Sequence, residues 1–353
     1  SSEFTADDEV FLNVYYTLKK AEQLLNAGYV IAKSQIPVNT SGFVFEQLAN
    51  KASGHPEILA PRIKEPDVNR VIVEGENFNI EFSKVDGFLC RYDVNGISML
   101  EKGTSLIPNF WRAGTDNDYG ARLNLKYKVW KNPVMKLKGI NSRVENSMVY
   151  VDAEYQMPEV FSILKLSYVI NNEGDIQVTQ KLLTEKGKKV PNMFRYGMRM
   201  RMPKEMYYSH FYGRGPVENY IDRNHNSFVG IYKMTTQEQF YPYIRPQENG
   251  CKTDIRWWNQ TNKGGIGLNF VASKPFSMVA LNYTIESLDD GDLKDQRHSG
   301  QVEPADFIEV CIDYAQQGLG GENSWGSTCL PQYRLTYKDY EFTYQIKPLD
   351  TVY

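Results

Sequence analysis

The chain has 353 residues, enough for one large domain or two ordinary ones, and enough to bury a substantial core without disulfides. Its 40 Lys and Arg nearly balance 43 Asp and Glu, and the formal net charge of −3 gives no drive toward nucleic acid or an anionic membrane. Neither partner is expected, and no apolar run approaches the roughly 20 residues of a membrane helix.

The cysteine and histidine content argues against a metal site. The four cysteines, at positions 90, 251, 311 and 329, are far apart and are expected to be buried free thiols. The four histidines show no i, i+4 pairing, so no zinc site is predicted. The start, "SSEFTADDEV", lacks Met, a basic segment and an apolar segment, and is expected to be a cut inside a longer protein. It therefore does not distinguish a bacterial cytoplasmic from a periplasmic location.

The first two predicted strands stand apart from the rest of the chain. Residues 9–19 and 29–38 alternate apolar and polar side chains, which indicates two strands. Two strands do not make a stable domain, so residues 1–40 are interpreted as the end of a β-sandwich. Residues 41–69, rich in Pro and Gly with little periodicity, are predicted to be a linker.

Residues 70–353 predict one large all-β domain. Strand-like runs follow one another from Val71 onward, with turn signals between them at Asn95-Gly96 and at residues 171–175. No long stretch with helical periodicity appears after residue 60. The pattern indicates about twenty antiparallel strands in a sandwich larger than an immunoglobulin-type domain.

Four loop-like segments concentrate the polar chemistry. They are "NFWRAGTDNDYG" (109–120), "YGRGPVENYIDR" (212–223), "YPYIRPQENGCKTDIRWW" (241–258) and "GLGGENSWG" (318–326). Carboxylates in such loops, among them Glu218, Glu248 and Asp116, could serve glycoside hydrolysis, which uses two carboxylates flanking one bond. The same residues could instead satisfy turns and neighbouring arginines, and the residue types alone favour this structural reading.

These four segments, with "YTIESLDD" (283–290), occur in an order that resembles the C-terminal domain of glycoside hydrolase family 2 β-galactosidases, called the β-galactosidase small chain. The resemblance covers roughly residues 70–350, and residues 9–38 resemble the last strands of the immunoglobulin-like domain that precedes it. It implies an antiparallel supersandwich, similar in fold to galactose mutarotases.

The resemblance also implies what this chain lacks. In the family, the catalytic glutamates and the magnesium and sodium sites belong to an upstream (β/α)₈ barrel, a fold of about 250 residues that this sequence does not contain. No catalytic residue, metal ligand or cofactor is therefore assigned here, and the chain alone is expected to be inactive. The implied partners are that barrel, the β-galactoside substrate and, as a possibility, further copies of the protein.

One loop is expected to contact substrate. By resemblance, Trp325 lies at the mouth of the barrel's active site and forms part of a sugar platform, with Asn323 and Ser324 shaping the loop. The physical logic agrees, because glycines let a loop project and an indole packs against the C–H face of a sugar. In the alternative, Trp325 caps its own sheet. Arg112, Asp116 and Asn117 are expected to organise the face that meets the barrel.

Two other functions compete with this reading. The chain could be a free-standing carbohydrate-binding module, which would bind galactosides without the barrel. It could also be an epimerase like the mutarotases, which needs an acid and a base on opposite sides of the sugar, and His210 with Glu218 is the candidate pair. The sequence identifies neither the exact glycoside nor the oligomeric state.

Overall fold

The computed structural model describes residues 4–5, 8–40, 45–50, 60–323 and 325–349. The described strands are β1 (Val10–Thr17), β2 (Val30–Asn39), β3 (Arg62–Lys64), β4 (Arg70–Glu74), β5 (Phe78–Ser83), β6 (Leu89–Val94), β7 (Ile97–Ser98), β8 (Ile107–Asn109), β9 (Lys136–Glu145), β10 (Met148–Met157), β11 (Ser162–Ile170), β12 (Ile176–Thr184), β13 (Arg195–Pro203), β14 (Tyr208–Gly215), β15 (Phe228–Thr235), β16 (Lys252–Thr261), β17 (Gly267–Leu281), β18 (Phe307–Gln316) and β19 (Tyr340–Leu349). The described α-helices are α1 (Asp116–Gly120), α2 (Leu123–Lys126), α3 (Thr236–Gln239) and α4 (Ile285–Leu288), and 3₁₀ turns occur at Lys128–Trp130, Pro158–Val160, Ser299–Gln301 and Pro331–Tyr333.

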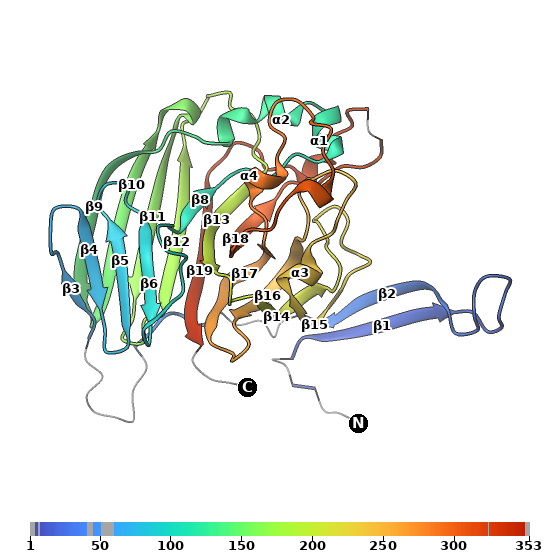
Figure 1. Ribbon diagram of the computed structural model, residues 1–353, viewed down its shortest axis with the longest axis horizontal. Coiled ribbons are helices and arrows are strands. Elements are labelled where there is room, and N and C mark those ends of the chain that lie inside the picture. Colours follow the sequence, from blue (N-terminus) through green and yellow to red (C-terminus); the bar gives the residue numbers. More distant parts are fainter. Residues whose placement is uncertain (1–3, 6–7, 41–44, 51–59, 324, 350–353) are drawn as a thin grey trace.

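A branched antiparallel sheet of twelve strands forms the body (Figure 1). Its main path runs β15-β14-β16-β17-β19-β12-β11-β10-β9, and β18, β13 and β8 branch from β17. The branch arises because β17 changes partner along its length. Its first part, from Gly267 to Ala272, pairs with β19, and its second part, from Ser277 to Leu281, pairs with β18. The all-β, antiparallel prediction is confirmed.

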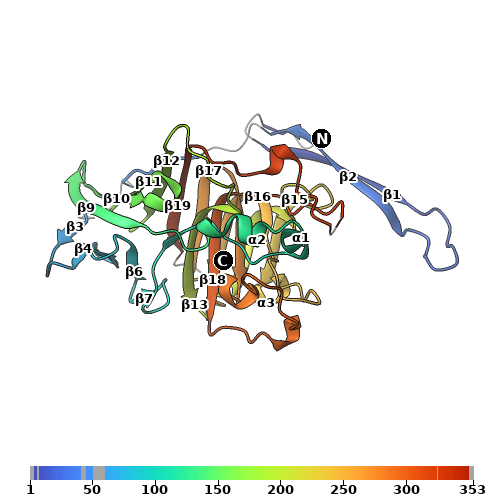
Figure 2. The same cartoon turned by 90° about the horizontal axis from the view of Figure 1, so that it is seen from above.

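A smaller sheet, in the order β3-β4-β5-β6-β7, packs against the part of the large sheet that contains β10 and β11 (Figures 1 and 2). The contact between them is aromatic. Phe82 meets Tyr168 edge-on with ring centroids 4.9 Å apart, and Phe88 stacks on Tyr155 at 5.4 Å. Strands β10 and β11 alternate buried and half-exposed residues, as a sheet with one covered face should. The two sheets therefore share one hydrophobic core.

The predicted hairpin turns lie where the sequence placed them. Asn95 and Gly96 both have positive φ, 51° and 77°, between β6 and β7, as the favoured two-residue turn requires. At the β11–β12 turn, the Asn171 side-chain oxygen accepts hydrogen bonds from the backbone N–H groups of Glu173 and Asp175. Local side-chain chemistry thus fixes the register of these strands.

Strands β1 and β2 form a hairpin that projects from the body (Figures 1 and 2). It touches the body at its base, where Glu9 pairs with Arg256 at 2.7 Å and Gln35 exchanges hydrogen bonds with the Val229 backbone. On the same hairpin, Leu12 and Tyr16 are more than half exposed. The two predicted strands are present, and their assignment to an immunoglobulin-like domain stays a prediction.

The segment expected to be a linker contributes to the fold. Residues 62–64 form β3, which pairs with β4 and extends the smaller sheet. Farther upstream, carbonyl oxygens of Glu46 and Ala49 accept hydrogen bonds from the side chains of Gln345 and Asn171. The composition of this segment does not predict these contacts, because residues 46, 49 and 62–64 make them through backbone groups. The proposed boundary at residue 70 therefore falls inside a paired region.

Candidate functional site

The glycine-rich loop follows β18 and carries Trp325 into solvent. The indole is 92% exposed. Gly320, Gly321 and Gly326 have φ of +75°, +125° and +110°, which only glycine adopts without strain. The expectation that the tryptophan points outward therefore matches the geometry, and Trp325 does not cap its own sheet. Its contact with a sugar remains a prediction.

Asn323 shapes the tip of this loop. Its side-chain oxygen accepts a hydrogen bond from the Trp325 N–H at 2.9 Å, and its amide nitrogen donates to the Ser327 hydroxyl at 3.0 Å. These are the local bonds of an Asx turn, which orient the backbone that carries the indole. Ser324, the other residue predicted to shape the loop, lies outside the described residues.

A buried ion pair supports the base of the loop. Arg112 is fully buried and binds Asp118 through two hydrogen bonds of 3.0 and 2.7 Å. The same guanidinium donates to the carbonyl oxygens of Gln317, at 2.6 Å, and Gly318, at 3.3 Å. Asp118 also caps α1 by accepting from the Thr115 N–H at 3.0 Å. One buried cation therefore joins the α1 segment to the loop.

The other two residues expected on this face behave differently. Asn117 donates to the carbonyl oxygen of Leu319 at 3.4 Å and so contributes to the same support. Asp116 instead accepts from Lys294 at 2.5 Å and from Arg245 at 3.2 Å. Burial acts to raise the pKa of Asp116, but these two cations outweigh it and the net shift is downward. Asp116 is thus a charged anchor beside the loop.

The two loop glutamates have structural partners. Glu218 accepts from Arg223 at 2.6 Å, from the Gly250 N–H at 2.8 Å and from the Tyr243 hydroxyl. Glu248 is buried and accepts from Arg195 at 3.0 Å. These contacts satisfy both carboxylates, as the structural reading of the sequence favoured.

Strand residues complete a buried charge cluster that the loop motifs did not reveal. Arg195 on β13 lies between Glu248 and Asp313 on β18, at 3.0 and 3.1 Å. Burial raises the pKa of Asp313 to about 7, and Glu248 adds to this against the opposing charge of Arg195. The available signal was a charged residue inside an apolar run, since the residues from Ile308 to Asp313 on β18 are all buried.

The two residues of the candidate epimerase pair have separate partners in the structure. His210 lies on β14 with its ring edge-on to Trp257, at a centroid distance of 5.0 Å. Burial, with the nearby Lys233, lowers the pKa of His210. Across the described chain, no hydrogen bond or ion pair links His210 to Glu218, whose partners are those given above. Arg223, Tyr243 and the Gly250 N–H hold the Glu218 carboxylate, and His210 packs against Trp257, so both residues have structural contacts in this fold.

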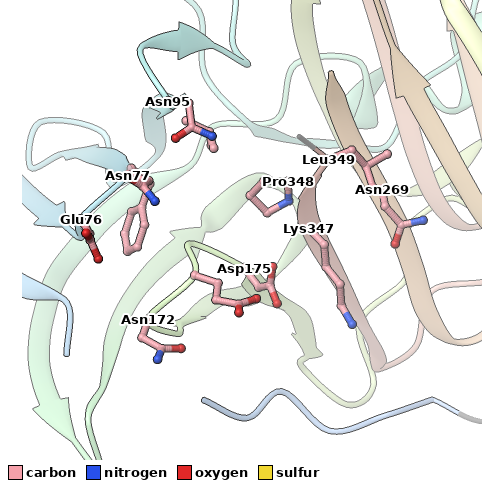
Figure 3. A pocket seen from close by; sticks show the side chains of 12 residues that line it. Glu76, Asn77, Asn95, Asn172, Asp175, Asn269, Lys347, Pro348 and Leu349 are labelled. Atoms are coloured by element: carbon pink, nitrogen blue, oxygen red, sulfur yellow. The ribbon is translucent and has the colours of Figure 1, made fainter. Parts of the chain in front are cut away.

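A hollow of about 430 Å³ lies near the end of β19, at the opposite end of the sheets from the glycine-rich loop (Figures 1 and 3). Its lining includes the amides of Asn77, Asn95 and Asn172 from three hairpin turns and the ammonium of Lys347. Phe78, its one aromatic lining residue in the described part, is buried. The hollow offers hydrogen-bonding groups but no exposed ring on which a sugar could stack.

Neither a metal cluster nor a membrane helix is found in the described parts of the chain. No group of three or more His, Cys, Asp and Glu side chains there could hold a metal ion. No described helix is long and apolar enough to cross a membrane. All four cysteines are free thiols, and Cys251, Cys311 and Cys329 are buried.

Comparison with known proteins shows the family of this chain. The family model described as beta galactosidase small chain matches residues 74–346. The chain therefore belongs to the beta-galactosidase small chain family. It is 29% identical to a beta-galactosidase of Priestia megaterium over 345 residues and 27% identical to one of Streptococcus thermophilus over 351 residues. These alignments cover 97% and 98% of the chain but 32% of each relative, so the chain spans about a third of their length.

Solved structures with a similar fold were also found. A galactose mutarotase related enzyme from Lactobacillus acidophilus matches with a TM-score of 0.45 and 7% identity, over 80% of this chain and 98% of that one. A galactose 1-epimerase from the same species matches with a TM-score of 0.42 and 10% identity, over 82% and 98%.

Proposed function

We propose that this chain is the non-catalytic C-terminal region of a retaining β-galactosidase of glycoside hydrolase family 2. The full-length protein would hydrolyse terminal β-D-galactosides at an active site formed by an upstream (β/α)₈ barrel. This chain would place Trp325 at the rim of that site, where the indole receives the sugar, mainly on the aglycone side. Asn323 and Ser324 would orient the loop.

The exposure of Trp325 is the observation that carries this proposal. Exposing a large indole to water is unfavourable in free energy, yet Trp325 is exposed on a loop whose base is hydrogen-bonded to Arg112. Such a surface suits the C–H face of a sugar. The relatives named above are beta-galactosidases about three times as long as this chain, which supports a substrate site built with a further domain.

The chemistry itself is assigned to the missing part of the protein. The acid/base, the nucleophile and the magnesium and sodium ions would belong to the barrel. The loop carboxylates Glu218, Glu248 and Asp116 are already engaged by arginine, lysine and backbone partners. The chain alone should therefore not hydrolyse an aryl β-galactoside, whereas the full-length protein should. Hydrolysis by the purified chain would overturn this assignment.

The exposed hairpin gives the proposed preceding domain a place to attach. Leu12 and Tyr16 on β1 and Ile31 on β2 are 53–62% exposed. Further strands of an immunoglobulin-like domain would cover such side chains, because a two-stranded ribbon is marginally stable in water. This chain would also support assembly with the barrel and, in a homo-oligomer, with other copies.

A carbohydrate-binding module is the second candidate, favoured by the same exposed indole. It predicts that the chain binds sugar without the barrel. Galactose and lactose would be titrated into the chain while intrinsic tryptophan fluorescence is followed, with Trp325→Ala as the control. A saturable change that is lost in the control would favour the module. No saturable change up to tens of millimolar would favour a platform that needs the barrel.

A further inference from the structure

The base of the Trp325 loop is held one residue at a time by side chains from distant segments. Arg112 binds the carbonyl oxygens of Gln317 and Gly318, and Asn117 binds that of Leu319. The next backbone group, the Gly320 N–H, donates to a carboxylate oxygen of Asp222 at 2.8 Å. Four consecutive residues of the loop are therefore fixed from outside it.

Beyond Gly320, the loop is held by hydrogen bonds within itself instead of bonds to distant segments. The side-chain hydrogen bonds of the tip that the structure describes are those of Asn323 with Trp325 and Ser327, all within the loop. Gly320 and Gly321 both have positive φ at this junction. The direction in which the tip leaves the body is thus set at Gly320, which is the residue that Asp222 holds.

Asp222 is well placed for this task. It belongs to the turn between Tyr220 and Arg223, closed by an N–H···O=C bond of 2.7 Å, and is half-buried. A Cβ on Gly318 would lie 2.6 Å from the bonded carboxylate oxygen, so this approach requires glycine. The other carboxylate oxygen is buried and has no hydrogen-bond partner among the residues that the structure describes. The carboxylate of Asp222 therefore accepts a charge-assisted hydrogen bond from the Gly320 N–H at a site where water has little access.

We propose that Asp222 is a positioning residue, which sets the place of Trp325 by holding the Gly320 N–H. It does not touch the sugar. Its importance for catalysis rests on the proposed function, whereas its effect on the loop does not. A charge-assisted hydrogen bond of this kind is strong enough that its loss changes local opening by about tenfold or more.

Hydrogen–deuterium exchange on the whole chain tests the proposal. In Asp222→Ala, amides of residues 320–327 should exchange roughly 10-fold faster, whereas those of β13 and β18 should keep their rates. Asp222→Asn retains an oxygen acceptor and should recover most of the protection. Asp152→Ala, which removes an exposed carboxylate on β10, is the matched control and should leave residues 320–327 unchanged. Unaltered exchange in Asp222→Ala would overturn the proposal.

Kinetics of the full-length protein separate this inference from the proposed function. If both hold, Asp222→Ala should raise KM for lactose in the same direction as Trp325→Ala, and Asp222→Asn should restore it. If Asp222→Ala loosens the loop while Trp325→Ala leaves the kinetics unchanged, the sugar platform fails and the positioning role stands. If Trp325→Ala impairs the enzyme but Asp222→Ala loosens nothing, the positioning role fails and the platform stands.

Discussion

Removing one member of the Arg112–Asp118 pair should destabilise the chain far more than removing a surface ion pair. Both side chains are at most 1% exposed and lie 2.7 Å apart. Arg112→Ala leaves a buried carboxylate without its cation, and Asp118→Ala leaves a buried guanidinium without its anion. Breaking a buried pair in this way costs about 3–5 kcal/mol in the free energy of unfolding.

The double variant distinguishes the pair from two independent contacts. If the losses were independent, Arg112→Ala with Asp118→Ala would cost the sum of the two. Because the second substitution removes the unpaired charge, we expect the double variant to fall short of that sum by about 2–3 kcal/mol. The remaining cost comes from the Gln317 and Gly318 carbonyl oxygens and the Thr115 N–H, which lose their partners.

Urea unfolding followed by far-ultraviolet circular dichroism measures this coupling. The matched control is Lys165 and Glu154, cross-strand neighbours 3.0 Å apart and both 45% exposed. Their coupling should be about 0–1 kcal/mol, since water screens an exposed pair. If the coupling of Arg112 with Asp118 is no larger than that of the control pair, the buried pair does not join α1 to the loop as argued.

Two further predictions concern the core. Burial lowers the pKa of Lys252 to about 8, so the folded chain loses this proton before the unfolded chain does and the free energy of unfolding should rise between about pH 8 and 10.5. The rise should amount to about 3 kcal/mol, and Lys252→Met should remove it. Urea unfolding curves measured over a pH series test this, and the same pH dependence in Lys252→Met as in the parent would contradict the prediction. Gly267→Ala should cost about 3 kcal/mol or more, because its Cβ would lie 2.1 Å from the Gln260 carbonyl oxygen. Gly264→Ala, where the nearest atom is a side-chain oxygen at 3.3 Å, is the control, and equal thermal midpoints for the two variants would refute the steric argument.

The sequence was most informative where the physical signal is local. Alternating strands and the Asn95-Gly96 turn depend on neighbouring residues, and both are present as predicted. The outward direction of Trp325 was expected from the glycines around it and from the family resemblance. Local pattern and backbone geometry agree there because glycine adopts a positive φ without the strain that a Cβ would bring.

Contacts between distant segments were not visible in the sequence. Asp222 stood within a quoted motif, yet nothing in its neighbourhood indicates the Gly320 N–H, 98 residues later. Likewise, β3 lies in a stretch whose composition resembles a linker, and it became a strand because β4 offered a pairing edge. Asp313 on β18 and Arg195 on β13 are both buried, and tertiary packing decided their roles.

The most direct test of the account is the steady-state kinetics of full-length Trp325→Ala and Trp325→Phe on lactose and an aryl β-galactoside. The indole is exposed in this domain, so its removal should leave the thermal midpoint of unfolding unchanged. We predict that Trp325→Ala lowers kcat/KM for lactose by roughly 5- to 150-fold, which corresponds to about 1–3 kcal/mol of lost apolar contact, and that Trp325→Phe retains most of the activity. Wild-type kinetics in Trp325→Ala on both substrates would contradict the claim that this loop forms part of the sugar site.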